Sequence, residues 1–189
     1  MNDSPVSLSV KGFLDDSIRY RVPMYQRNYA WSEGEITQLI QDIIDCLPDQ
    51  KPYYIGTLVV CKKLENQKYI YETVDGQQRL TTISLLASFL KNENKGDFSW
   101  YKSLCIEFEC RERSQKTFET IFNNRFQDDP TELLRYAEIN TAILNGYRII
   151  KRILPIKLNE KLISYKEFFE SFTTWLKVSF KIRRSDFTF

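Results

Sequence analysis

The alternation of apolar and polar residues predicts a strand that runs directly into a helix near the middle of the chain. Between residues 68 and 74, aromatic and β-branched side chains recur at every second position, which is typical of a half-buried strand. Further on, the apolar positions follow helical spacing: Leu80, Ile83, Leu86, Ala87 and Leu90. The five residues from Asp75 to Arg79 therefore carry the chain from a sheet to a helix, and four of them are polar.

The same kind of pattern predicts the other elements. Residues 53–62 alternate as a strand, and we expect this strand to pair antiparallel with residues 68–74 as a β-hairpin. Two capping boxes, Ser32 with Glu35 and Ser164 with Glu167, mark the starts of helices. The remaining expected elements are strands at 6–10, 104–108 and 175–180, a turn of helix within 14–20, a helix around 118–122, and a long helix from 129–130 to Pro155.

Composition narrows the chemistry that the chain can perform. Its 189 residues are 42% hydrophobic and 28% charged, which is typical of a globular rather than a disordered protein. The absence of histidine excludes HNH and HEXXH metal chemistry, Ser-His and Cys-His nucleophiles, and Cys2His2 zinc sites. Walker A, GXGXXG and GXSXG motifs are also missing, so a nucleotide site would be neither a P-loop nor a Rossmann site. The net charge of +2 argues neither for nor against nucleic acid.

Cysteine usage and hydropathy bear on the compartment. The four cysteines form no CXXC pair, and the chain opens with neither a basic n-region nor an apolar leader. No apolar run approaches the roughly 18 residues of a membrane span. These features predict a cytoplasmic protein with reduced thiols and no membrane contact.

The strand-to-helix turn has the composition of an anion site. A helix N-terminus leaves its first N–H groups unpaired and adds the positive end of the helix dipole, and both attract a phosphate. Gly76 would allow a close approach or a positive φ, and Arg79 in the first helical turn could grip phosphate oxygens in a bidentate way. Asp75 could hold a divalent metal or a water, while Gln77 and Gln78 could orient a water or a sugar hydroxyl.

A purely structural interpretation of the same turn is also open. Asp75 could cap the helix, Gly76 could serve the turn, and Arg79 could pair with Asp75 or with Glu72. Because the motif is short, its spacing alone does not choose between the two interpretations.

Aromatic rings and a guanidinium gather just before the helix that follows Ser32. Gln26 and Arg27 could contact a nucleotide or a phosphate, with Tyr25 or Tyr29 as a stacking surface for a base. In the alternative interpretation the aromatic side chains belong to the core, and Arg27 stacks on Trp31 without a ligand.

Two further positions leave alternatives open. Gly56 marks a bulge or a close approach in the first strand of the hairpin, either to a ligand or to the neighbouring helix. Arg111 and Arg113 follow a strand, where they could complete an anion site or form a solvated charged corner.

Three stretches occur in a fixed order: VPMYQRNYAW at 22–31, YIGTLVV at 54–60, and DGQQR followed by LTT at 75–82. In order and spacing they resemble the N-terminal domain family of GmrSD-type restriction endonucleases, closely up to residue 90 and more loosely beyond. The resemblance implies a ParB/sulfiredoxin-like fold. We therefore expect an α+β protein with a small mixed sheet and flanking helices at residues 1–95. A strand and a mainly helical extension at residues 96–189 would pack on that core.

The resemblance also implies a function. It indicates an NTP-binding module of a restriction or anti-phage defence system that acts on foreign DNA, with any hydrolysis dependent on a divalent metal such as magnesium. The implied nucleotide-binding residues are Tyr25, Gln26, Arg27, Gly56, Gly76, Arg79 and Thr81. The implied catalytic residues are Asp75, which is also the metal ligand, and Gln77, Gln78 and Arg79. DNA would be a partner through the complete system, and whether the chain forms a homo-oligomer is left open.

The end of the chain departs from the family pattern. After a strand like that at 175–180, relatives continue with a helix and an FE-x-x-N-x-R-G loop, and many then carry a histidine-dependent HNH nuclease domain. Neither is found here, so we expect a truncated chain without its nuclease, and hydrolysis by this chain is left open. The alternative function is a non-catalytic DNA- or partner-binding domain that uses the same turn to grip a backbone phosphate.

Overall fold

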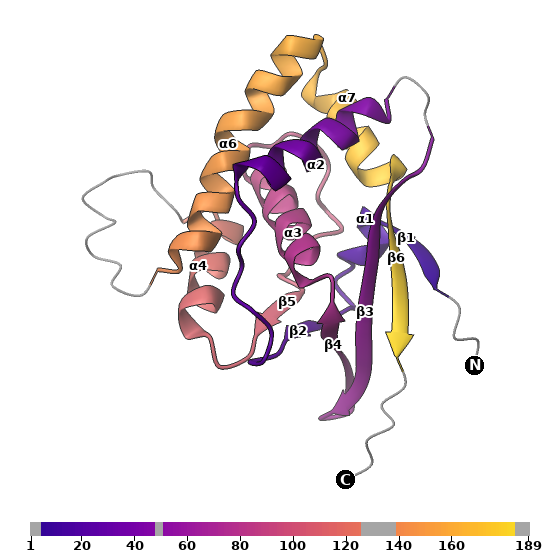
Figure 1. Ribbon diagram of the computed structural model, residues 1–189, viewed down its shortest axis with the longest axis vertical. Helices are drawn as coiled ribbons and strands as arrows, with labels where there is room; N and C mark the ends of the chain where they lie inside the picture. Colours follow the sequence, from indigo (N-terminus) through magenta and orange to yellow (C-terminus); the bar gives the residue numbers. More distant parts are fainter. Residues whose placement is uncertain (1–4, 48–50, 126–138, 184–189) are drawn as a thin grey trace.

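The computed structural model, which describes residues 5–47, 51–125 and 139–183, has helices packed on a six-stranded mixed sheet (Figure 1). The order of strands across the sheet is β1-β6-β3-β4-β2-β5. The strands are β1 (Val6–Ser9), β2 (Tyr20–Val22), β3 (Tyr53–Glu65), β4 (Lys68–Asp75), β5 (Ile106–Phe108) and β6 (Leu176–Arg183). The expected α+β class is confirmed.

A group of helices covers one side of the strands, and Figure 1 shows α2, α3, α4 and α6 lying close together there. The helices within the described residues are α1 (Val10–Phe13), α2 (Glu33–Asp45), α3 (Gln77–Asn92), α4 (Glu112–Phe122), α6 (Thr141–Lys161) and α7 (Tyr165–Glu170), with a π-helical turn η1 (Ser171–Trp175) directly after α7. The central helix is α3, in which every residue from 80 to 90 is buried. It contacts α4, α6 and β3, so its first turn is held in a fixed position.

The hairpin and the strand-to-helix junction agree with the prediction. β3 and β4 pair antiparallel, with Glu65 opposite Lys68. Asn66 and Gln67 form the two-residue turn with positive φ, a backbone conformation that suits the twist of a hairpin. β4 ends at Asp75, and α3 begins at Gln77.

Strands from both halves of the chain share the sheet. β6 lies between β1 and β3, antiparallel to the first and parallel to the second. β5 pairs parallel with β2 at the far edge. The second half of the chain is thus mainly helical but also contributes two strands to the sheet.

Some element boundaries differ from the sequence-based expectation. The predicted turn of helix within 14–20 lies earlier, as α1, because Ser9 caps that turn by accepting from the N–H of Gly12. Pro155 lies inside α6 and does not end it. The buried stripe of α6 continues past the proline to Leu158, so packing outweighs the loss of one N–H donor. The expected start at 129–130 lies outside the described residues, but a helix that runs unbroken from there is wrong. α6 begins at Thr141, because the side chain of Asn140 caps it by accepting from the N–H groups of Ala142 and Ile143.

Both predicted capping boxes are present, at the starts of α2 and α7. The apolar run that follows Ser164 does not stay α-helical, because η1 ends it and Leu176 pairs with Tyr53 of β3. Within the described ranges, none of the helices has the length and apolar character that crossing a membrane requires.

Candidate functional site

The β4–α3 junction depends on Gly76. Gly76 is the N-cap residue of α3 and has a left-handed φ of 89°. A Cβ at this position would lie 2.7 Å from the carbonyl oxygen of Thr57 and 3.1 Å from the Cα of Leu58. Glycine is therefore needed both for the backbone conformation and for the close packing of α3 on β3. Among the described residues no side chain caps this helix, so Asp75 is not a cap and the first N–H groups of α3 have no side-chain partner.

Arg79 lies in the first turn of α3 with its guanidinium against β3. Its Nη1 donates to the carbonyl oxygen of Thr57 at 2.7 Å. The close approach at Gly56 is made by this side chain, because a Cβ on Gly56 would lie 2.8 Å from Nη1. Among the described residues Arg79 has no carboxylate partner. The predicted structural pairings of Arg79 with Asp75 or Glu72 are therefore wrong.

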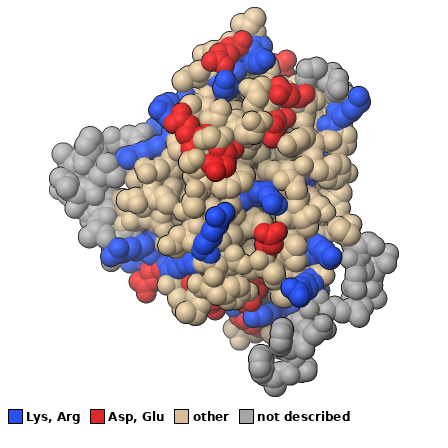
Figure 2. Space-filling view, viewed as in Figure 1, with Lys and Arg blue, Asp and Glu red and all other residues tan. Residues whose placement is uncertain are grey.

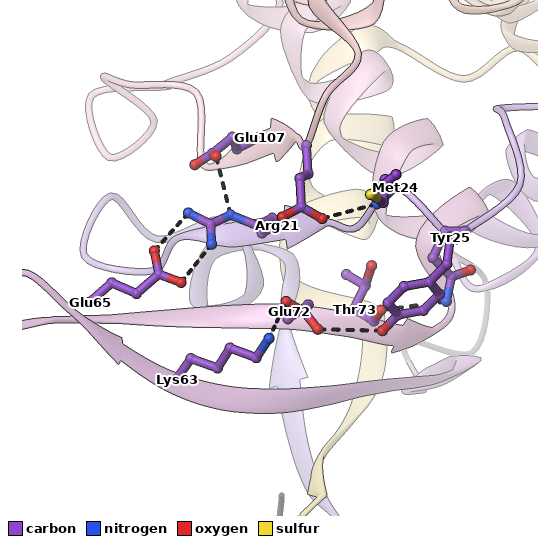
Figure 3. Close-up of polar contacts among 10 residues, drawn as sticks. Arg21, Met24, Tyr25, Lys63, Glu65, Glu72, Thr73 and Glu107 are labelled. Carbon is purple, nitrogen blue, oxygen red and sulfur yellow. Dashed lines mark hydrogen bonds and ion pairs between the residues drawn. The ribbon is translucent and has the colours of Figure 1, made fainter. Parts of the chain in front are cut away.

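Two cations on the nearby strands, Arg21 and Lys63, are in contrast paired with carboxylates (Figure 3). Arg21 of β2 donates to both carboxylate oxygens of Glu65, at 2.7 and 2.9 Å, and to Glu107 at 3.2 Å. These carboxylates raise the pKa of Arg21. Lys63 of β3 contacts Glu72 at 2.7 Å, which raises the pKa of the lysine. Glu72 is thus already used by a cation from β3.

The DGQQR turn and the segment before α2 are joined by bonds between glutamine amides and backbone groups. Gln77 donates from Nε2 to the carbonyl oxygen of Arg27 at 2.8 Å. Gln78 donates to the carbonyl oxygen of Asn28 at 3.0 Å and accepts from the N–H of Ala30 at 2.8 Å. Both polar atoms of the Gln78 amide are therefore occupied, whereas Gln77 retains an oxygen without a hydrogen bond among the described residues.

Gln26 and Arg111 also tie the segment before α2 to other elements through hydrogen bonds to backbone carbonyls. Gln26 donates from Nε2 to the carbonyl oxygen of Val74, the residue before Asp75, at 2.7 Å. Arg111, the N-cap residue of α4, donates to three backbone carbonyls, those of Met24, Gln26 and Arg27. Neither sequence-based alternative for Arg111 anticipated this contact. No sequence signal could have found it, because its acceptors are backbone oxygens.

The aromatic residues of this segment divide into two kinds. Tyr29 is 5% exposed, and its hydroxyl lies 2.9 Å from that of Thr82 on α3, so it belongs to the core. Burial raises the pKa of Tyr29 to about 12. Tyr25 is 66% exposed, and its hydroxyl donates to Glu72 at 3.4 Å (Figure 3). Its ring thus remains accessible for stacking.

The other predicted site residues lie at different depths. The side chains of Arg27 and Asp75 are exposed and have no hydrogen bond or ion pair within the described part of the chain. The described cation–π pairs do not include Arg27 with Trp31, so that predicted stack is not found among them. Thr81 is 2% exposed within α3.

Arg79 also lines a groove between α2 and β3 with a volume of about 530 Å³. This volume falls within the range of small-molecule sites. Other groove-lining residues are Trp31, Glu35, Gln38, Asp42, Tyr53 and Ile55. Figure 2 shows basic and acidic side chains close together on the face that carries α2, with no broad patch of one sign.

A divalent cation would have Asp75 as its protein ligand at this turn. No group of three or more histidine, cysteine or acidic side chains suited to a metal occurs in the described ranges. Magnesium, however, commonly binds through one or two carboxylates together with substrate phosphates and water. The exposed and unpaired carboxylate of Asp75, one residue before the N-cap of α3, fits that mode of binding.

The chain matches the sequence model of a known protein family. A sequence model of the family described as GmrSD restriction endonuclease, N-terminal domain, matches residues 10–187, nearly the whole chain. A search of curated proteins gives no match.

Proposed function

The chain belongs to the GmrSD restriction endonuclease N-terminal domain family, and from this premise we propose that it is the nucleoside-triphosphate-binding module of a restriction system. The observation that carries the proposal is the state of Arg79. Its guanidinium lies beside an uncapped helix N-terminus and has no carboxylate partner among the described residues. Arg21 and Lys63 on the neighbouring strands are both paired with glutamates.

Electrostatics favours a polyphosphate at this turn. The first N–H groups of α3 and the positive end of its dipole attract an anion. Arg79 adds a fork of donors, of which one N–H is directed to the carbonyl of Thr57. Arg27, exposed on a segment that bonds directly to the turn through Gln77, could supply a second cation. A triphosphate carries enough negative charge to use all of these groups.

In hydrolysis, the residues around the turn would each have a different role. Asp75 would hold a magnesium ion, which when bound neutralises charge on the phosphate oxygens. Gln77 is only 5% exposed, and its amide oxygen has no hydrogen bond among the described residues, so it would accept one from an attacking water that enters beside the turn, while its nitrogen stays on the carbonyl of Arg27. Arg79 and Arg27 would stabilise the charge that develops in the transition state. Gln78, with both amide atoms occupied, would keep the segment before α2 in place.

Calorimetric titration with the four ribonucleoside triphosphates, in the presence of magnesium, tests the proposal. Arg79→Ala should weaken triphosphate binding by about 1.5–3 kcal/mol, the range for a hydrogen bond to a charged group. It should lower the free energy of unfolding by only about 1 kcal/mol, for the lost bond to the carbonyl of Thr57. Arg21→Ala is the matched control, because Arg21 lies outside the groove and is bound to Glu65 and Glu107. This control should keep binding intact.

Two outcomes would contradict the proposal. One is the absence of triphosphate binding by the parent chain. The other is a large fall in the urea midpoint of Arg79→Ala with unchanged binding. Binding to DNA alone, with an affinity that falls steeply as salt increases, would favour a phosphate-gripping DNA module instead.

A further inference from the structure

In the groove between α2 and β3 that Arg79 lines, some polar side chains already have hydrogen-bond partners and others keep acceptors without one. The amide nitrogen of Gln38 donates to one oxygen of Asp42 at 2.7 Å, and the hydroxyl of Tyr53 donates to the other at 2.7 Å. The bond to Asp42 raises the pKa of Tyr53 to about 12, so this hydroxyl keeps its proton at neutral pH. Gln38 and Tyr53 therefore each donate a hydrogen bond to Asp42, so that both carboxylate oxygens of Asp42 already accept one.

Glu35 and Gln38 retain acceptors in the same groove. One carboxylate oxygen of Glu35 accepts from the hydroxyl and the backbone N–H of Ser32. These bonds hold the pKa of Glu35 below its usual value, so the group is an ionised acceptor at neutral pH. Its other oxygen and the amide oxygen of Gln38 have no hydrogen bond within the described part of the chain. Three positions apart on α2, the two side chains lie on one face of the helix.

Glu35 has a structural role in the capping box of α2, but it also lines the groove, where its carboxylate would repel the phosphates of a bound polyphosphate. Arg27 lies close enough to contribute to the lowered pKa of Glu35, but the two form no ion pair among the described residues. The repulsion is offset if the carboxylate faces a part of the ligand that is rich in hydrogen-bond donors. In a nucleotide that part is the edge of the base.

We propose that this groove binds the nucleotide base and selects guanine, an inference that rests on the proposed triphosphate binding. Guanine presents N1–H and the 2-amino group as adjacent donors with no acceptor between them, which matches the two free acceptors of Glu35 and Gln38. Adenine offers one amino group beside an acceptor nitrogen. Uracil offers one N–H between two carbonyl oxygens, which a carboxylate repels. Trp31 and Ile55 provide apolar surface for the ring, and Arg79 lines the same groove for the phosphates.

Calorimetric titration of the parent chain with magnesium and GTP, ITP, ATP or UTP tests the inference. ITP differs from GTP only by the absence of the 2-amino group, so GTP should bind at least about tenfold more tightly, as expected for a hydrogen bond to a charged acceptor. Glu35→Gln should bring the ratio of GTP to ITP affinity close to one. Glutamine also serves in a capping box, so this variant should fold.

Glu33→Gln is the matched control, because Glu33 lies on the same turn of α2 but pairs with Arg152 and does not line the groove. It should keep the preference for GTP. Equal affinities of the parent for GTP and ITP, or a preference that survives Glu35→Gln, would overturn the inference. Either result would leave the proposed function standing as long as Arg79→Ala weakens triphosphate binding as expected. If no triphosphate binds at all, both the inference and the proposed function fail.

Discussion

The guanidinium of Arg79 occupies the space that a side chain on Gly56 would need. A Cβ at position 56 would lie 2.8 Å from Nη1 and 3.0 Å from Cζ of the arginine, and φ at this glycine is +115°. The same position coincides with a register shift in the pairing of β3 with β6, between Tyr54 and Thr57. An irregularity of the strand thus makes room for the arginine, and the two residues act as one unit.

Gly56→Ala should therefore weaken triphosphate binding by displacing Arg79. It should also lower the free energy of unfolding by about 1–3 kcal/mol, because alanine tolerates this positive φ poorly. Calorimetry and urea unfolding measure the two effects separately. In the double variant with Arg79→Ala, the loss of binding should equal that of Arg79→Ala alone. Additive losses would show that Gly56 acts on the ligand independently of the arginine.

Gln78→Ala should destabilise the fold more than Gln77→Ala. It removes two hydrogen bonds and leaves the N–H of Ala30 without its partner, at a cost of about 2–3 kcal/mol. Gln77→Ala removes one bond, to the carbonyl of Arg27, at about 1 kcal/mol. Urea midpoints check the order, with Gln41→Ala as an exposed control whose amide bonds only to Asp45. A reversed order would mean that Gln78 does not hold the segment before α2.

Gly146→Ala and Gly34→Ala should change stability in opposite directions. A Cβ at Gly146 of α6 would lie 2.8 Å from Cε1 and 3.0 Å from the hydroxyl of Tyr29. This overpacking should cost about 1–3 kcal/mol. Gly34 is exposed on α2 and has open space around it, so alanine should stabilise that helix by about 0.5–1 kcal/mol. Urea unfolding measures both, and equal effects would contradict the packing of Tyr29 against α6.

The capping carboxylate of Glu167 should make stability depend on pH in the acid range. The hydroxyl of Ser164 and, to a smaller extent, the backbone N–H of Ser164 donate to the carboxylate of Glu167. These bonds lower the pKa of Glu167 from 4.5. The unfolded chain then has the higher pKa, so this stabilisation is present above about pH 4.5 and is lost as the pH falls through the folded-state value. Glu167→Gln keeps the capping box but does not titrate, so its unfolding free energy should fall less steeply in acid. Parallel curves for parent and variant would contradict this assignment.

Local sequence determined the elements around the site. The change from period two to helical spacing correctly predicted the hairpin of β3 and β4 and the start of α3 after Gly76. The serine and glutamate pairs correctly predicted the starts of α2 and α7. These features depend on residues within a few positions of one another, so the sequence contains the whole signal. Gly76 was also recognisable from sequence, because a polar turn between a strand and a helix commonly needs a positive φ.

Tertiary structure alone decided how the site residues are used. Arg79 has no carboxylate partner among the described residues. One of its expected partners, Glu72, instead pairs with Lys63 from the neighbouring strand, and that pairing depends on strand register. Gln78 and Arg111 bind backbone groups of the segment before α2, and every residue type has such groups. The insertion of β6 between β1 and β3 brings together segments more than a hundred residues apart. Such contacts follow from the packing of the whole core and have no local period or motif, so the sequence read by itself could not predict them.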